Sequence, residues 1–495
     1  MTFSHSKKQF DNLIKKKSNF IFYKKILKLN SDPIPSFINL VEKNKYSFLY
    51  ESVEKGREKG RYSICGYDSL RTIQLTNDTL TLENNKVIKK IKYRGSPLKK
   101  IDSIIKNLKF IKSKRLPPMS GAFFGYIAYE NINKVEKISS KRKKDDLKTP
   151  DIIMFIPNNL LIYDNFSASL FIIKHYLSSA KTKNFHKQIL DINEIENNIK
   201  KVKGYRDINF NKKKKITVKS NMTKTTFKTN IKKAKQYIKN GDIFQVVPSQ
   251  RFETNFNQKS SFLYEVLRKT NPSPFMYYFN LPKFEIVGSS PEILVRLRSN
   301  EITIRPIAGT RPRGKNKIED KKFESELMND KKEIAEHLML LDLGRNDVGK
   351  VSRKSSVKVT SKFKIERYSH VMHIVSNVTG KLKNNTSSIS ALMAGFPAGT
   401  VSGAPKIRAM QIIDELETTK RGIYSGGIGY ISSNGDMDTC IVLRTGIITK
   451  NKLYVQAGGG VVFDSDSEKE FNETVNKAKA VLNAAEIVMG NVQWY

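Results

Sequence analysis

The stretch FESELMNDKKEIAEHLMLLDLGRND, residues 323–347, predicts a long helix at the centre of the second half. Its aliphatic side chains return every three or four positions or at multiples of a turn, which is the spacing of a buried helical stripe. The stripe consists of Leu327, Ile334, Leu338 and Leu341, and it predicts one helix over about 323–341. Glu333 and Glu336 lie one turn apart on a neighbouring face of that helix.

A second apolar stripe predicts the last helix, from about residue 467 to 488. Glu470, Glu473 and Lys477 share another of its faces. Ser467 with Glu470 also matches the capping-box pattern, so Glu470 is either a helix cap or a site residue. Glu336 and Glu473, on two separate helices, suit an Mg²⁺ ion that keeps several waters, and the alternative is that both are surface glutamates.

Short apolar runs around these helices predict many strands. The first 190 residues alternate such runs with turns and charges, and later strands are expected at 285–288, 294–297, 301–306, 427–431 and 453–457. A Lys- and Asn-rich stretch at 193–222 separates the two halves. We therefore expect an α/β (α+β) fold with an amino-terminal domain over residues 1–200 and a second domain over 215–490.

The composition narrows the class of protein. The 89 Lys and Arg exceed the 47 Asp and Glu, which gives a formal charge of +42. This charge is spread along the chain without an aromatic platform for bases, so a basic nucleic-acid-binding protein is kept only as the alternative from a different class. The two cysteines cannot form a disulfide framework. Since no uncharged apolar run is long enough to span a membrane, we expect a cytoplasmic protein.

Four glycine-rich turns predict a site for a small anion. They lie at 309–310, 399–402, 426–427 and 458–460, where backbone N–H groups can approach a ligand. The turns follow neither the dinucleotide pattern nor the P-loop pattern. Together with Lys406, Arg444 and Lys477, they indicate a polyanionic small molecule rather than a nucleotide.

Eight strings of the second half together resemble the chorismate-utilising enzymes. They are GDIFQVVPSQRF (241–252), NPSPFMYY (271–278), GSSPE (288–292), PIAGTRPRG (306–314), AEHLMLLDLGRND (335–347), YSHVMH (368–373), GFPAGTVSGAPK (395–406) and NETVNKAKAVL (472–482). The resemblance covers about residues 215–485. It implies a large two-sheet sandwich enclosed by helices, with the active site in the second half.

Two positions separate the reactions of this family. Members that add water to chorismate typically carry a lysine where this chain has Gln245, and aminodeoxychorismate synthases typically carry a lysine where it has Ala308. The resemblance therefore favours the anthranilate synthase branch, whose Mg²⁺-dependent lyases make anthranilate and pyruvate from chorismate and ammonia in the first step of tryptophan biosynthesis. Component I of aminodeoxychorismate synthase is the alternative within the family.

The resemblance also implies roles for individual residues. The expected metal ligands are Glu336 and Glu473, and the expected catalytic residues are Glu333 as the acid for the departing hydroxyl, His373 for pyruvate elimination and Thr400 for orienting ammonia. The expected chorismate-binding residues are Gly309, Thr310, Tyr424, Arg444, Gly458, Gly459, Gly460 and Lys477.

The amino-terminal string SFLYESVEKGREKGRYS (47–63) is similar to the element that receives feedback tryptophan in this branch, with Ser52 at its centre. The implied contacts across from it are Pro274, Phe275 and Met276, while Tyr50 stands where leucine is usual. No segment resembles a glutaminase. The resemblance therefore implies a separate glutamine amidotransferase subunit, commonly in a heterotetramer, and tryptophan as an inhibitor.

Overall fold

The computed structural model describes residues 3–52, 60–84, 87–93, 95–138, 143–178, 184–202, 204–368 and 371–491. The helices are α1 (Lys7–Lys15), α2 (Ile34–Lys43), α3 (Pro97–Asn107), α4 (Phe185–Lys201), α5 (Lys224–Lys239), α6 (Ser260–Thr270), α7 (Lys317–Asn329), α8 (Lys331–Val351), α9 (Ser388–Gly395), α10 (Gly399–Ser402), α11 (Lys406–Leu416) and α12 (Ser467–Gly490), with a 3-10 helix η1 (Tyr129–Lys134). The strands are β1 (Phe20–Ile26), β2 (Ser47–Glu51), β3 (Tyr62–Thr76), β4 (Thr79–Asn84), β5 (Val87–Lys92), β6 (Ala122–Ile127), β7 (Ile152–Asp164), β8 (Ser169–Tyr176), β9 (Lys219–Ser220), β10 (Gln245–Val246), β11 (Ser249–Asn255), β12 (Phe275–Asn280), β13 (Glu285–Ser290), β14 (Ile293–Arg298), β15 (Glu301–Ile304), β16 (Ile307–Pro312), β17 (Lys358–Arg367), β18 (Val371–Lys381), β19 (Gly403–Ala404), β20 (Gly427–Ser432), β21 (Met437–Ile441), β22 (Thr445–Thr449) and β23 (Lys452–Gly458).

The strands of the two halves belong to one hydrogen-bonded system. Within the described residues, 21 strands join in one sheet, and β10 and β19 form a separate pair. The halves meet where β2 pairs with β12 and β6 pairs with β20, both antiparallel. The α/β class and the five expected strands of the second half are confirmed. Backbone hydrogen bonds cross from one half to the other, and the division into two domains stays a prediction.

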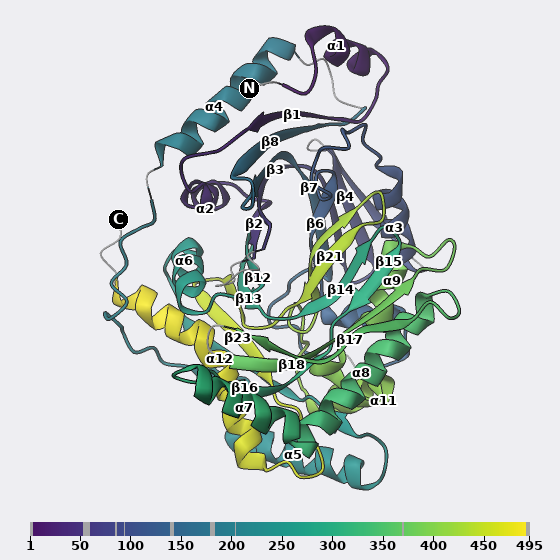
Figure 1. Cartoon of the computed structure of the whole chain (residues 1–495), viewed down its shortest axis with the longest axis vertical. Coiled ribbons are helices and arrows are strands. Elements are labelled where there is room, and N and C mark those ends of the chain that lie inside the picture. The colour runs from purple at the N-terminus through teal and green to yellow at the C-terminus, as the bar shows by residue number, and fades with distance from the viewer. Residues whose placement is uncertain are drawn as a thin grey trace.

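Helices cover the outside of this sheet system, and the aromatic core lies between the strands. In Figure 1, α2, α4, α6, α12, α7 and α8 run along the periphery while the strands occupy the interior. Phe48 of β2 stacks on Phe124 of β6, with ring centroids 4.1 Å apart, and on Phe279 of β12 at 5.5 Å. Such pairs add about 0.5–1.5 kcal/mol beyond area burial, so this cluster ties the two halves together.

The two helices expected in the second half, over about 323–341 and 467–488, differ in detail from the prediction. The single helix over 323–341 is wrong, because Asp330 ends α7 and caps α8, its side chain accepting from the backbone N–H of Lys332 and Glu333. The stripe is also wrong at Leu338, which lies on the outer face of α8 and is 44% exposed. The α12 helix begins at Ser467 as expected, but Asp466 is its cap. The capping box of Ser467 with Glu470 is therefore wrong.

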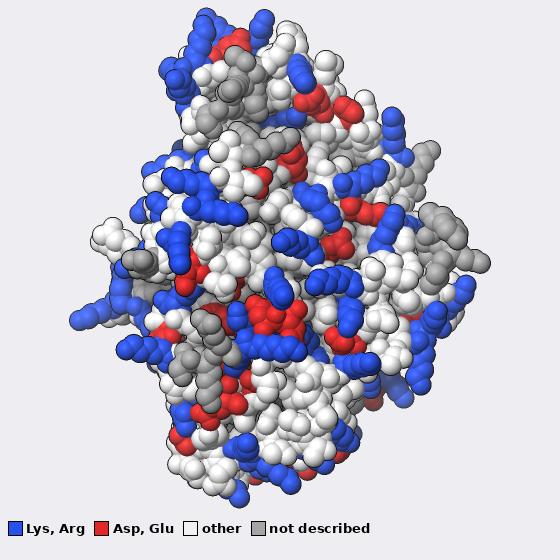
Figure 2. Space-filling model, turned by 180° about the vertical axis from the view of Figure 1, so that it is seen from behind, with Lys and Arg blue, Asp and Glu red and all other residues white. Residues whose placement is uncertain are grey.

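The positive charge of the chain is dispersed over its surface. Figure 2 shows Lys and Arg side chains scattered across one whole face and intermixed with Asp and Glu, rather than gathered in one patch. A nucleic-acid footprint would gather the basic side chains together. The dispersed charge on this face therefore disfavours the nucleic-acid alternative. Among the residues that the structure describes, no helix is long and apolar enough to cross a membrane.

The pairing of β20 with β21 should be sensitive to a single added methyl group. Gly429 has φ of 153°, and a Cβ there would lie 2.1 Å from the carbonyl oxygen of Asp438 in the neighbouring strand. We predict that Gly429→Ala lowers the free energy of unfolding by at least about 3 kcal/mol in urea titrations. Gly435→Ala is the matched control, since Gly435 also has a positive φ but its Cβ would meet only Ser388 Oγ, at an ordinary contact distance of 3.9 Å, and it should cost about 1 kcal/mol. Equal losses for both variants would contradict the steric argument.

Candidate functional site

Carboxylates from two helices face one another beside a buried amide. Gln245 Nε2 of β10 donates to Glu336 Oε1 of α8 at 3.0 Å. Burial raises the pKa of Glu336, and the nearby carboxylates of Glu333 and Glu473 raise it further. Glu473, on α12, is half-exposed and pairs with Lys477 at 2.7 Å. The two predicted metal ligands therefore repel one another across the same space.

This carboxylate arrangement fits a weakly held Mg²⁺ ion. No cluster of three or more His, Cys, Asp or Glu with metal-binding geometry occurs in the described part of the chain. Mg²⁺ needs no such cluster, because it commonly takes one or two carboxylates and completes its shell with water and substrate oxygens. A cation between Glu336 and Glu473 would relieve the repulsion that raises the pKa of Glu336. Glu470 adds a buried carboxylate oxygen, Oε2, that has no hydrogen-bond partner.

The three glycines at the end of β23 lie close to three side chains of the site. A Cβ at Gly458 would lie 3.0 Å from the hydroxyl of Tyr424, and one at Gly460 would lie 2.9 Å from Gln245 Nε2. A Cβ at Gly459 would lie 2.9 Å from Glu470 Oε2. Any side chain here would displace a polar group of the site, which explains the run of three glycines. Lys477 Nζ also donates to the carbonyl of Gly458 at 3.1 Å, so α12 is fastened to this turn.

A histidine lies at the opposite wall, on β18. His373 Nδ1 is 3.0 Å from the carbonyl oxygen of Gly309 and 3.0 Å from the hydroxyl of Thr310. A carbonyl can only accept, so Nδ1 carries the proton and Nε2 is the free base. Burial lowers the pKa of His373, and the Arg444 guanidinium lowers it further. The imidazole is therefore neutral at neutral pH.

Glu333 lies next to this histidine turn. Gly309 has φ of 72°, and its Cβ position is 3.3 Å from Glu333 Oε2. Arg311 pairs with Glu333 at 3.2 Å. The structure thus brings Glu333, Gly309, Thr310 and His373 together. It gives Glu333 a cationic partner that the sequence did not indicate.

Glu292 is a partly buried side chain beside the candidate site that the sequence analysis did not single out. Thr400 Oγ1 donates to Glu292 Oε2 at 2.9 Å. Burial raises the pKa of Glu292, while Thr400, Arg444 and Lys477 oppose the rise. Glu292 stands in the quoted GSSPE string, so its position was visible, but no helical or strand pattern distinguishes it from a surface glutamate. The backbone of Arg444 has φ of 47°, a strained conformation of the kind that clusters at functional sites.

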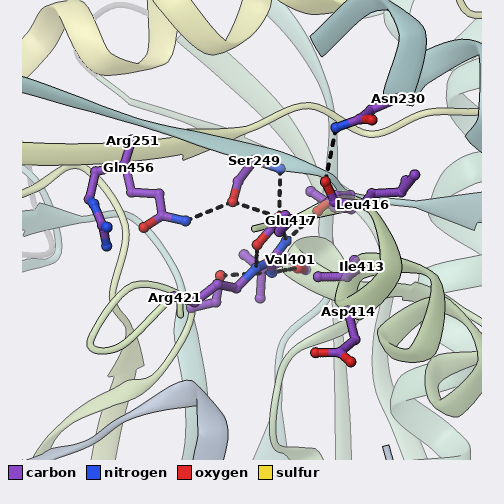
Figure 3. Close-up of polar contacts among 12 residues, drawn as sticks. Asn230, Ser249, Arg251, Val401, Ile413, Asp414, Leu416, Glu417, Arg421 and Gln456 are labelled. Carbon is purple, nitrogen blue, oxygen red and sulfur yellow. Dashed lines mark hydrogen bonds and ion pairs between the residues drawn. The ribbon is translucent and has the colours of Figure 1, made fainter. Parts of the chain in front are cut away.

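One buried ion pair joins the segments that carry these residues. Figure 3 shows Arg421, Glu417 and Ser249 converging. Arg421 donates to Glu417 at 2.6 and 2.9 Å, and also to the carbonyls of Val401 at 2.7 Å and Val247 at 2.6 Å. Glu417 accepts from the backbone and hydroxyl of Ser249, both at 2.8 Å. The pair therefore links the Thr400 turn to the strand that follows Gln245.

Lys406 does not contribute a free charge to this site. Its ammonium is buried against Asp347 at 2.6 Å. The sequence-based grouping of Lys406 with Arg444 and Lys477 is therefore wrong. Its role is to fasten α11 to α8.

A cavity separate from these residues lies where the amino-terminal string 47–63 meets β12. It has a volume of about 460 Å³ and is lined by Tyr50, Ser52, Pro274 and Phe275, among others. Met276 is fully buried in the core and does not line it. Tyr50 pairs with Tyr277 across the β2–β12 ladder. The two predicted strings are thus adjacent, while residues 53–59 of the amino-terminal string lie outside the described residues.

Comparisons with known proteins agree on one family. A family model described as chorismate binding enzyme matches residues 46–483. Anthranilate synthase component 1 of Cereibacter sphaeroides is 44% identical over 479 residues, covering 94% of this chain and 95% of that protein. The protein of the same name from Aquifex aeolicus is 42% identical, covering 94% of each chain.

Solved structures agree with the sequence comparison. Anthranilate synthase component I from Streptococcus pneumoniae superimposes with a TM-score of 0.76 and 34% identity, covering 92% of this chain and 99% of that one. The menaquinone-specific isochorismate synthase of Escherichia coli gives a TM-score of 0.70 at 17% identity, covering 96% and 98%. The second likeness shows the shared fold alone.

Breaking the buried ion pair should destabilise the chain strongly. We predict that Arg421→Leu lowers the free energy of unfolding by about 3–5 kcal/mol, because it leaves the Glu417 carboxylate buried without its cation. Arg345→Leu, which breaks the exposed pair with Asp342, is the control and should cost less than about 1 kcal/mol. Urea unfolding followed by circular dichroism measures both. A loss of under 1 kcal/mol for Arg421→Leu would refute the central role of the pair.

Proposed function

Because the chain belongs to the chorismate-binding enzymes, we propose that it converts chorismate and ammonia to anthranilate, pyruvate and water, the first step of tryptophan biosynthesis. The observation that carries the choice of reaction is the Gln245 amide bound to Glu336. An amide cannot serve as the general base that addition of water requires, whereas ammonia is itself a nucleophile. The names of the relatives support the same reaction.

The charges of the site suit a dicarboxylate. Arg444 offers a planar fork to one carboxylate, and Lys477 adds a second positive charge held beside Gly458. Partial burial would lower the pKa of Lys477, but the Glu473 carboxylate outweighs it, so the pKa is raised. Gly309, Thr310, Tyr424 and the turn of Gly458, Gly459 and Gly460 supply hydroxyl and backbone donors. These residues form the proposed chorismate site.

Mg²⁺ is the proposed cofactor, held by Glu336 and Glu473. When bound, it supplies positive charge for the second substrate carboxylate. The assignment is supported by the effect of Glu473, which raises the pKa of Glu336, because a cation between the two carboxylates would offset this repulsion.

The reaction needs two proton transfers in this scheme. Ammonia attacks carbon 2 of the ring as the carbon 4 hydroxyl departs with a proton as water, and loss of the enolpyruvyl group as pyruvate then yields the aromatic amine. Glu333, which pairs with Arg311, is one candidate acid for the hydroxyl. Burial favours the protonated form of Glu292, so the geometry supports Glu292 in this role, with Thr400 orienting it or the ammonia. His373 Nε2 is the base for the elimination.

The proposal includes a partner and an inhibitor. The name component 1, carried by the relatives, implies a second component, and we propose that this is a glutamine amidotransferase chain that supplies ammonia in a heterotetramer. We further propose tryptophan as a feedback inhibitor in the cavity lined by Ser52, Pro274 and Phe275, next to Met276 in the chain. Tyr50 fills part of this cavity and sets its shape.

Product formation tests the reaction and the metal together. We expect the chain, given chorismate, Mg²⁺ and ammonium at alkaline pH, to form a fluorescent product that chromatographs as anthranilate, together with pyruvate. Glu336→Ala should lower this rate at least about 100-fold, and chelation of Mg²⁺ should abolish it. Glu326→Ala, on the exposed face of α7, is the control and should leave the rate unchanged. A nonaromatic amine or isochorismate as the product would refute the assignment.

Tryptophan should inhibit through the second cavity. Ser52→Ala removes a hydroxyl from its lining, so we predict a rise of about 10-fold in the inhibitory concentration of tryptophan, with an unchanged rate in its absence. Ser103→Ala, on α3, is the control. If both variants keep the inhibition of the unmodified chain, Ser52 does not contact the inhibitor.

A further inference from the structure

One carboxylate of the amino-terminal half reaches the turn that carries Tyr424. Glu130, in η1, accepts from the backbone N–H of Arg421 at 2.8 Å and from that of Gly422 at 3.0 and 3.4 Å. The backbone N–H of Tyr129 donates in return to the carbonyl of Gly422 at 2.8 Å. Two neighbouring residues of one half therefore hold both the donors and an acceptor of a turn in the other half.

The turn held in this way leads directly to a residue of the proposed chorismate site. Gly422 has φ of 61° and Ser425 has φ of 62°, so both lie in the left-handed region, which is unfavourable for serine. Tyr424 lies between them, and its hydroxyl would be 3.0 Å from a Cβ at Gly458. A displacement of the turn at Gly422 is therefore passed to the Tyr424 hydroxyl.

The guanidinium of Arg421 connects the same two segments a second time. It lies over the ring of Tyr129, 4.9 Å from the ring centroid, and over the ring of Tyr424 at 5.6 Å. A cation within about 6 Å of a ring centroid is attracted to the face of that ring. The position of the Tyr424 ring therefore depends on Tyr129 and Glu130 together, through Arg421.

The charge of Glu130 does not stabilise the fold by itself. Burial raises the pKa of Glu130 to about 7, and Asp151 adds to the rise, while the backbone donors and Lys420 oppose it. The carboxylate is partly exposed in a cavity of about 650 Å³. A carboxyl group whose pKa is higher in the folded chain than in the unfolded chain lowers stability at neutral pH. The use of this carboxylate therefore lies in the turn that it holds.

We propose that Glu130 is a positioning residue of the chorismate site, which fixes the turn at 421–422 and thereby the hydroxyl of Tyr424. The inference rests on the proposed function, since it takes Tyr424 as a chorismate-binding residue. A carboxylate suits this role because its two oxygens accept from two successive N–H groups, whereas an amide would turn its own NH2 group toward one of them. The amino-terminal half thus completes the substrate site.

A double-mutant cycle tests whether Glu130 acts through Tyr424. Glu130→Gln, Tyr424→Phe and the double variant are titrated with chorismate by isothermal titration calorimetry, with Mg²⁺ but without ammonium or glutamine, so that binding is measured without amination. Glu130→Asp enters the same cycle as a second variant, because it keeps the charge but withdraws both oxygens by one carbon. Glu194→Gln, at an exposed position of α4 in the same half, is the control. Urea unfolding verifies that each variant is folded.

We expect Glu130→Gln and Tyr424→Phe each to raise the dissociation constant of chorismate at least about 10-fold, and Glu194→Gln to leave it unchanged. In the Tyr424→Phe background, Glu130→Gln should add no more than about twofold, because the contact through which it acts is already lost. Glu130→Asp should show the same coupling.

An unchanged dissociation constant in folded Glu130→Gln and Glu130→Asp would overturn the proposal. Effects that multiply to about 100-fold in the double variant would also overturn it, since Glu130 would then act independently of Tyr424. The unmodified chain is assayed in parallel for anthranilate formation from chorismate and ammonium. If it binds chorismate but makes no anthranilate, the proposed function is refuted, while the cycle still decides the role of Glu130.

Discussion

The Arg421–Glu417 pair is the constraint on which the site depends. Both side chains are almost fully buried. The guanidinium of Arg421 donates to Glu417 and to the carbonyls of Val401 and Val247. Desolvation of such a pair is expensive and is offset only when the geometry satisfies both groups. The carbonyls that complete it belong to Val247 and Val401, on segments that are distant in the chain. The pair can therefore form only when the Gln245 strand and the Thr400 turn are already in register.

Three carboxylates gather on one side of the candidate site, with Lys477 paired to one of them. Glu336, Glu473 and Glu470 gather on one side, where burial and mutual repulsion raise the pKa of Glu336 and Glu470. Arg444 lies on the other side, and it lowers the pKa of His373. In a chain with a formal charge of +42, such a local excess of carboxylate is the unusual feature. It argues for a cation that completes the site, since an anionic substrate alone would add to the repulsion.

Sequence reasoning proposed many residues of the candidate site but not the connections between them. The glycine turns, Arg444, Lys477 and the two glutamates were proposed from residue type and spacing, the family resemblance then implied their roles, and the structure places Lys477 against both Gly458 and Glu473. The helix break at Asp330 was missed because apolar spacing continues across it, while the cap depends on one local side-chain bond. Leu338 was placed in the core for the same reason. Glu292 and Arg421 were missed because their importance comes from tertiary partners that no local pattern specifies.

The shared strands also explain why an inhibitor cavity and a catalytic site would be found in one sheet system. Pro291 lines the cavity next to Phe275, and the adjacent Glu292 accepts the Thr400 hydroxyl. The backbone N–H of Ser289, on β13 just before Pro291, donates to the carbonyl of Arg444 at 3.2 Å. One peptide bond thus separates a wall of the cavity from a carboxylate of the site. Because packed strands shift as units, a ligand that moves this segment must move Glu292 and Arg444 with it.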